Sequence, residues 1–278
     1  MTRLRSLWLA AGLCAAGNAA QAAPPPGHRL VWSDDFRQEP GAVPDPARWG
    51  YDLGAGGWGN AELETYTNAP ANAQVIADPF ATDGRALRIR AMRDGKGGYT
   101  SARLLTKDRA SFQYGYIEAR IQLPHGQGIW PAFWMLGQDI GAVGWPKCGE
   151  IDILENIGRE PSRLHGSLHG PTHNGGNGLT ASRDLAAGEA FKDRYHLFAV
   201  DWRKDAVTFF LDGASYGTFT PADVPDDGPW SFNKPFFLLL NVAVGGHWPG
   251  PPDETTTFPQ DMKVDYVRVY QPVLTATK

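Results

Sequence analysis

The chain has 278 residues, of which 42% are hydrophobic and 20% are charged, and its formal net charge is −4. Its 33 glycines and 22 prolines are too many for a long helical bundle and are typical of a protein built from strands and turns. Aromatic residues make up 12% of the chain, which gives it more apolar surface to bury than a disordered chain has. The basic residues are scattered, whereas a nucleic-acid-binding surface needs them clustered, so we expect no nucleic-acid partner.

The first 22 residues have the three parts of a secretory signal peptide. Arg3 and Arg5 form a basic start, residues 7–17 are apolar, and Ala20-Gln21-Ala22 is a small-x-small cleavage pattern. We therefore expect cleavage after residue 22 and a secreted protein, either extracellular or periplasmic. Loss of the two arginines changes the formal net charge from −4 to −6.

The remaining chain is predicted to form one domain. Residues 23–27 are a Pro-rich segment, residues 28–271 contain no linker, repeat or low-complexity stretch, and residues 272–278 form a C-terminal tail. No apolar run after the signal reaches the ~20 residues of a membrane-spanning helix, so we expect a soluble protein with no membrane partner. We also expect a monomer. Cys148 is the one cysteine left after cleavage, so no intramolecular disulfide can form.

Apolar and polar residues alternate with a period of two along most of the domain, which predicts half-buried strands. The clearest alternating runs are residues 85–91, 116–123 and 264–270. The runs 132–136 and 236–244 are continuously apolar, so we expect them to be central strands covered on both faces.

Turn signals complete this picture. Residues 207–219 contain Asp212-Gly213, a pair suited to a tight hairpin, and the one short helix is expected near residues 189–192. Many short strands with Gly-rich connections predict an all-β fold of two stacked antiparallel sheets. Such a sandwich often binds an extended polymer on one concave face.

The most informative segment is residues 149–156, with the sequence GEIDILEN. Its isoleucines and leucine favour a strand, and on a regular strand Glu150 and Asp152 share one face while Glu155 points to the other. A β-bulge around Ile153-Leu154, which adds one residue, would bring Glu155 onto the same face. Carboxyl groups that lie so close cannot all ionise freely, so at least one pKa is expected to rise.

This arrangement suits a glycoside hydrolase. A retaining enzyme holds two carboxyl groups roughly 5–5.5 Å apart and an inverting enzyme roughly 6.5–9.5 Å apart, so clustering on one strand favours retention. A solvated acidic strand and a calcium site are the alternatives for the same residues. Tryptophans lie close by in residues 128–136, GIWPAFWML, and in Trp145-Pro146. Because tryptophan faces stack on sugar rings, this context favours a sugar polymer as the ligand.

Together these segments resemble glycoside hydrolase family 16, and within it the laminarinases, which are endo-1,3-β-glucanases. The matching segments follow one another along nearly the whole chain after the signal peptide, at residues 58–63, 128–136, 149–156, 168–170, 241–246 and 264–270. The resemblance implies a jelly-roll sandwich of the concanavalin A type with its substrate cleft on the concave sheet. It also implies hydrolysis of internal β-1,3 bonds in laminarin-type glucans by double displacement, without a catalytic cofactor.

The resemblance assigns roles to the three acids. It implies that Glu150 is the nucleophile, Glu155 the general acid/base, and Asp152 a residue that hydrogen-bonds the nucleophile. Glu155 must first be protonated to donate to the leaving oxygen, and the negative charges of the other two acids raise its pKa toward the working pH.

The same resemblance implies further ligands by position. The residues expected to bind substrate are Asn60, Arg103, Trp130, Trp134, Trp145, His169 and Trp248. Many family members also carry a structural calcium on the convex side, so that Asp265 and the backbone carbonyl of Gly84 are its possible ligands here. The alternative is that Asp265 only faces solvent.

Three positions depart from the family pattern. Asp35 stands in the opening Ser-Asp-Asp-Phe where a Glu is common, Glu64 stands where Gln is frequent, and His247 precedes Trp-Pro-Gly where another polar residue is usual. None of these belongs to the acid motif. They could alter substrate preference or calcium affinity.

Other functions remain open at this point. Lichenases lack the inserted residue before the last Glu, which favours the laminarinase-like branch, although galactan-cleaving relatives share the insertion. Mixed-linkage glucans and galactans are therefore alternative substrates. A non-catalytic glucan-binding protein on the same fold is an alternative of a different class, but such proteins have typically lost the catalytic acids, and both Glu150 and Glu155 are present here.

Overall fold

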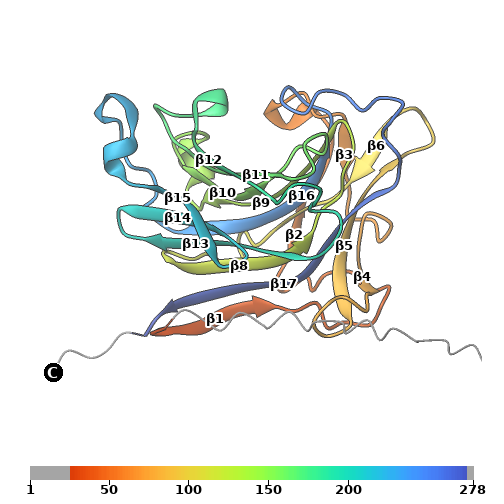
Figure 1. The fold of residues 1–278 in the computed structure, drawn as a ribbon, viewed down its shortest axis with the longest axis horizontal. Helices are drawn as coiled ribbons and strands as arrows, with labels where there is room; N and C mark the ends of the chain where they lie inside the picture. Colours follow the sequence, from red (N-terminus) through yellow and green to blue (C-terminus); the bar gives the residue numbers. More distant parts are fainter. Residues whose placement is uncertain (1–25, 274–278) are drawn as a thin grey trace, which may run out of the picture.

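The computed structural model describes residues 26–273, so the predicted signal peptide lies outside the described residues. Two β-sheets stack face to face, with β9, β10 and β11 in one layer and β8, β13 and β17 in the other (Figure 1). This arrangement confirms the predicted two-sheet sandwich.

The larger sheet has ten strands, of which β8, β13 and β17 form the lower layer in Figure 1, while β3 and β6 lie at its upper right. Its order is β15 (Ala214–Phe219), β14 (Ala206–Leu211), β13 (His196–Arg203), β8 (Gly115–Gln122), β17 (Gln260–Pro272), β5 (Arg85–Arg93), β6 (Tyr99–Ser101) and β3 (Glu64–Tyr66). In addition, β1 (His28–Asp34) pairs with β17 and β4 (Ala73–Ala77) pairs with β5. Among the described strands, β3 and β6 form a parallel pair, whereas the other pairs are antiparallel. The sheets are antiparallel as predicted, with this one parallel pair at the edge as the exception among the described strands.

The smaller sheet has seven strands and carries the acid motif. Its order is β12 (Leu179–Asp184), β11 (Arg163–His169), β10 (Glu150–Glu155), β9 (Ile129–Gly137), β16 (Phe236–Val244), β7 (Arg103–Leu105) and β2 (Gly50–Asp52). The helical segments are short: α1 (Ile140–Val143) and the 3₁₀ turns η1 (Gly57–Gly59), η2 (Gly175–Asn177), η3 (Pro221–Asp223) and η4 (Pro225–Asp227). Within residues 26–273, no helix is long and apolar enough to cross a membrane.

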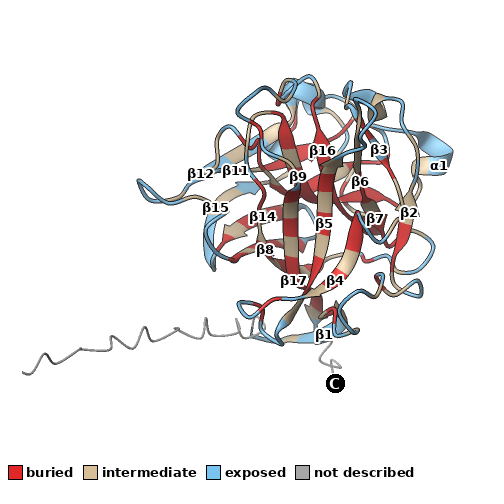
Figure 2. Cartoon of the chain, turned by 90° about the vertical axis from the view of Figure 1, so that its right-hand side faces the viewer, coloured by how far each residue is buried: buried red, intermediate tan, exposed pale blue. Residues whose placement is uncertain are grey.

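The core lies between the two sheets. Every residue of β16 is buried, as expected for a central strand, and Figure 2 shows β9 and β17 largely buried as well. Large side chains such as Trp202, Phe198 and Phe133 are fully buried between the layers. Burial of apolar surface contributes about 25 cal/mol per Å², so this interior stabilises the fold without any disulfide among the described residues.

The hairpin at Asp212-Gly213 is confirmed, but the predicted helix is not. Asp212 and Gly213 have φ angles of 49° and 81°, the left-handed conformation that a two-residue hairpin turn requires. The predicted helix near residues 189–192 is a pair of turns, closed by the bonds from Glu189 N–H to Ala186 O and from Asp193 N–H to Ala190 O. The short α1 lies instead at residues 140–143.

Candidate active site

A β-bulge in β10 sets the geometry of the three acids. Against β9, Asp152 lies opposite Trp134 and Leu154 lies opposite Phe133, so one residue of β10 is extra. The same shift occurs against β11. The bulge predicted around Ile153-Leu154 is therefore confirmed, and its effect is that Ile153 and Leu154 both point into the core. The acids are left on the outer face of the sheet.

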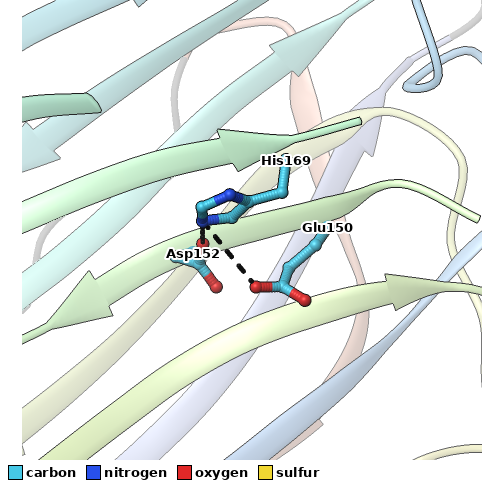
Figure 3. Close-up of side chains that lie close together, drawn as sticks. All are labelled: Glu150, Asp152 and His169. Atoms are coloured by element: carbon cyan, nitrogen blue, oxygen red, sulfur yellow. Dashed lines mark ion pairs between the residues drawn. The ribbon is translucent and has the colours of Figure 1, made fainter. Parts of the chain in front are cut away.

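His169 of β11 joins two of these acids. Figure 3 shows its ring nitrogen directed at Glu150 and Asp152, with Nε2 3.2 Å from Asp152 Oδ2 and 3.9 Å from Glu150 Oε1. Asp152 lies close enough to Glu150 for its charge to act on that carboxyl group, and its own Oδ2 is buried without a hydrogen-bond donor within residues 26–273. The Asp152 side chain is 3% exposed and that of Glu150 is 17% exposed, so the pair is almost out of water.

These three side chains are also a possible metal site. One ligand atom from each of Glu150, Asp152 and His169 lies within 4.8 Å of the others, and two carboxylates with an imidazole are a donor set that divalent metals accept. His169 Nε2 lies 3.2 Å from Asp152 Oδ2, but neither Asp152 Oδ2 nor His169 Nδ1 has a hydrogen-bond partner among the described residues.

Each proposed catalytic glutamate accepts one indole N–H. Trp145 Nε1 donates to Glu150 Oε2 at 2.8 Å, and Trp130 Nε1 donates to Glu155 Oε1 at 3.0 Å. These bonds fix one oxygen of each carboxyl group and leave the other available to substrate. Trp145 is 47% exposed, so its ring is accessible as well as hydrogen-bonded.

Burial and mutual repulsion perturb all three acids. Burial and then the charge of Asp152 raise the pKa of Glu150 to about 8, against the effects of His169 and the Trp145 N–H. Burial raises the pKa of Asp152, and burial together with the charges of Asp152 and Glu150 raises the pKa of Glu155 well above its usual value. The rise expected from the sequence is present, and it keeps Glu155 able to hold a proton.

The predicted substrate-binding residues divide into two groups. Trp130 and Trp248 pack edge to face, with ring centroids 5.5 Å apart, on the side of Glu155. Arg103 lies on the opposite side of the motif, where its guanidinium covers the rings of Trp58 and Trp134 at 5.0 and 4.6 Å.

Asn60 lies beside the second group. Its side chain donates to Glu62 Oε1 at 3.1 Å, and its backbone carbonyl accepts the N–H of His247 at 2.8 Å. The loop of Asn60 and the loop of Trp248 are therefore in direct contact, so the predicted ligands line one continuous face.

Sequence reasoning missed several residues of this face. His165 pairs with Glu155 across β10 and β11, and its ring contacts that of Trp248 at 5.0 Å. Asn241 accepts Trp134 Nε1 at 2.7 Å and donates to the Tyr66 hydroxyl. Asn241 lies in a segment that matched the family, and its signal was a polar residue within an otherwise apolar strand. His165 lies outside the matching segments, in a strand of mixed polarity.

The predicted calcium ligands already have partners. The Asp265 carboxylate, 2% exposed, accepts the N–H and hydroxyl of Thr82 and pairs with Arg120. The Gly84 carbonyl accepts the N–H of Asp78 at 3.0 Å. The guanidinium of Arg120 therefore occupies the place beside Asp265 that a calcium ion would take. These residues do not fit a calcium site. The alternative that Asp265 faces solvent does not hold either, because it is buried.

Cys148 has a structural role. It is fully buried and packs with Leu105, Leu136, Phe237 and Leu239, and burial raises its pKa to about 11. A thiol with so high a pKa is a poor nucleophile. Cys148 therefore packs the turn that precedes β10 into the interior.

The family model "Glycosyl hydrolases family 16" matches residues 66–268. The chain belongs to this family. It is 40% identical to a beta-glucanase of Rhodothermus marinus over 256 residues, which cover 88% of this chain and 86% of that protein. It is 37% identical to a glucan endo-1,3-beta-glucosidase of Cryptopygus antarcticus, with coverage of 86% and 90%.

Solved structures of family 16 laminarinases have the same fold. The catalytic domain of an endo-1,3-beta-glucanase from Thermotoga petrophila matches with a TM-score of 0.79 and 43% identity, over 88% of this chain and 98% of that one. The endo-beta-1,3-glucanase of Pyrococcus furiosus matches with a TM-score of 0.80 and 43% identity, over 88% and 95%. The resemblance to the laminarinase-like branch is thus confirmed, and the protein is a glycoside hydrolase.

Proposed function

We propose that this family 16 protein hydrolyses internal β-1,3 bonds of a laminarin-type glucan with retention of configuration. The observation that carries the proposal is the bulge at Ile153, which gathers Glu150, Asp152 and Glu155 on one face of β10. The similarity to endo-1,3-beta-glucanases supports the substrate class.

In the first step Glu155 is the acid and Glu150 the nucleophile. Glu155, kept protonated by burial and by the neighbouring charges, donates its proton to the glycosidic oxygen. Glu150 attacks the anomeric carbon through Oε1, because Oε2 is held by the Trp145 N–H. The glycosidic bond breaks, and a glycosyl ester with Glu150 forms.

In the second step the glycosyl ester lowers the pKa of Glu155. Ester formation removes the negative charge of Glu150, which contributes to the high pKa of Glu155. Glu155, having given up its proton, now remains ionised more readily and accepts a proton from the attacking water. The water oxygen bonds to the anomeric carbon, the ester bond breaks, and Glu150 leaves as a carboxylate. Asp152 is a positioning residue, since its charge acts on Glu150 and its Oδ2 lies 3.2 Å from His169 Nε2. Two carboxyl groups complete this cycle without a cofactor.

The test is the anomeric configuration of the first product from laminarin, followed by NMR. A β-configured product is expected, and an α-configured product would overturn retention. Glu150→Gln should lower kcat by about 10³-fold or more, because the nucleophile is lost. An active Glu150→Gln variant would overturn the assignment of the nucleophile.

A panel of substrates tests the linkage. We expect new reducing ends from laminarin, and comparison with lichenan, agarose and carrageenan measures the tolerance for mixed-linkage glucans and galactans. Retention of laminarin on the protein without any new reducing ends would instead indicate a glucan-binding protein.

We further propose that residues 1–22 direct secretion. Arg3, Arg5 and the apolar run 7–17 support this proposal. The N-terminal sequence of the protein recovered outside the cytoplasm should begin at Ala23. An intact N-terminus in the cytoplasmic fraction would contradict it.

A further inference from the structure

Glu64 of β3 is a buried acid for which the proposed mechanism has no use. It is 1% exposed, its Oε2 accepts the N–H of Val244 at 2.6 Å, and its Oε1 is buried without a donor. No basic side chain within residues 26–273 forms an ion pair with Glu64. An ionised carboxylate in such surroundings costs several kcal/mol, so the neutral acid is favoured.

Glu62 lies next to Glu64 and can only accept. Its Oε1 accepts the amide of Asn60 and its Oε2 accepts the hydroxyl of Tyr66, both at 3.1 Å. The carboxyl group of Glu62 is close enough to that of Glu64 for its charge to act on it. Two ionised carboxylates at this range repel each other, whereas a proton on one of them would let the pair hydrogen-bond.

The direction of the neighbouring hydrogen bonds decides which one carries it. Trp134 Nε1 is a donor only, so the amide oxygen of Asn241 must accept, and the Asn241 amide nitrogen then donates to the Tyr66 hydroxyl. Tyr66 accepts this bond and therefore donates its own proton to Glu62. Glu62 is thus an acceptor on both oxygens, and the remaining proton belongs to Glu64.

This chain of bonds ends beside the catalytic acids. Trp134 lies opposite Asp152 across β9 and β10, and its ring is covered by Arg103. At the other end, Glu62 orients Asn60, a residue expected to contact the sugar chain. Glu64 therefore lies behind the substrate face and acts through Glu62.

We propose that Glu64 is a protonated positioning residue, whose hydrogen bond to Glu62 holds Asn60 and Tyr66 in place for the glucan. The proposal rests on the proposed function only in naming glucan as the ligand. Burial and the charge of Glu62 raise the pKa of Glu64 to about 8. Deprotonation above that pH would leave two repelling carboxylates and loosen Asn60.

Few other groups influence this proton. From its own segment, Glu62 and Tyr66 face Glu64. From the neighbouring strands, β16 offers the Val244 N–H, and Tyr99 of β6 lies opposite Glu64 with its ring against Phe258. Arg103 of β7 acts on Tyr66 and is paired with Asp52.

The first test does not use the substrate. The infrared difference spectrum between the full-length protein and Glu64→Gln should contain the band of a protonated carboxyl group at about pH 6, and this band should titrate near pH 8. An ionised carboxylate band at about pH 6 would overturn the proposal. If Glu64→Gln does not fold, neutron diffraction from the unaltered protein should locate a deuteron between Glu64 and Glu62, and its absence would have the same consequence.

The second test measures KM for laminarin against pH. Gln offers a permanent N–H to Glu62 and a carbonyl to Val244, so the ratio of the wild-type KM to that of Glu64→Gln should rise about tenfold between pH 6 and pH 9. Titration of the catalytic acids changes KM equally in the wild type and in Glu64→Gln, so it does not change the ratio of the two KM values. A flat ratio would overturn the role of Glu64.

A matched variant completes the design. Glu62→Gln places an amide N–H next to the donors of Asn60 and Tyr66. This variant should therefore raise KM at every pH rather than only above pH 8. Equal pH profiles for Glu62→Gln and Glu64→Gln would overturn the assignment of the proton. If laminarin is not cleaved at all, the proposed function fails, while the infrared and neutron measurements still test the proton on Glu64.

Discussion

Trp145 donates its indole N–H to Glu150 at 2.8 Å although its ring is 47% exposed. This bond lowers the pKa of Glu150 and thereby favours the ionised nucleophile. Trp145 therefore has two functions, since the same side chain offers a ring face to a sugar and a proton to the carboxylate. A phenylalanine would keep the ring and remove the donor.

We predict that Trp145→Phe moves the acid limb of kcat/KM to higher pH by about half a unit to one unit. The sign follows from the role of the bond: without it the pKa of Glu150 rises, so the nucleophile is ionised only at higher pH. The measurement is the pH profile on laminarin, with Trp32→Phe as a control at a tryptophan that packs against Trp49 and Phe112, away from the acids. An unchanged acid limb would contradict the prediction.

Trp130 acts in the same way on Glu155. Its N–H bond lowers the pKa of Glu155, so Trp130→Phe should raise that pKa and extend the alkaline limb to higher pH. The acid limb should stay in place, because Trp130 does not contact Glu150. A profile in which both limbs move equally would show that the two indoles do not act on separate carboxyl groups.

His169 provides the contrasting case. A positive charge on this ring lowers the pKa of both Glu150 and Glu155, so a replacement that cannot carry that charge raises both. We predict that His169→Gln moves the whole bell-shaped profile of kcat/KM upward by about half a unit to one unit. Movement of one limb alone would mean that His169 influences only one acid. Thermal unfolding of the variant at each pH separates this effect from loss of structure.

The sequence predicted most of the fold because its strands are regular. Residues 236–244 were expected to be a central strand, and β16 has those bounds. The β-bulge was predicted because side chains alternate along a regular strand, so that Glu155 would point away from Glu150 and Asp152 without an extra residue. The helix near residues 189–192 was wrong, since its polar residues satisfy turns as well as a helix, and only tertiary contacts choose between them.

The network behind the site was harder to predict. Glu62, Glu64, Tyr66 and Asn241 come from two distant segments, and their sequence gives no sign that they share hydrogen bonds. The partner of Asp265 was likewise hidden, because Arg120 lies 145 residues away in sequence and meets it only after β8 pairs with β17. Long-range pairing of polar groups depends on strand register, which composition and periodicity do not determine.

The Asp265 ion pair leads to a final prediction about calcium. Arg120 is stacked on the ring of Tyr195 at 4.6 Å and compensates the charge of Asp265, so the protein should not need a metal ion there. We predict that EDTA changes the Tm by less than about 2 °C and that added calcium does not raise it. A fall of several degrees that calcium restores would establish a calcium site.

The ion pair itself should contribute to stability. Arg120→Ala leaves the carboxylate of Asp265, which is 2% exposed, without its cation, and breaking such a buried pair costs about 3 kcal/mol. For a domain of this size the Tm should then fall by about 6–12 °C, since each kcal/mol corresponds to about 2–4 °C. Arg120→Lys, which keeps the charge, should lose less. If added calcium rescued the Tm of Arg120→Ala, the guanidinium would be acting in place of a metal ion; if it did not, the pair is stabilised by its own hydrogen bonds to Thr82.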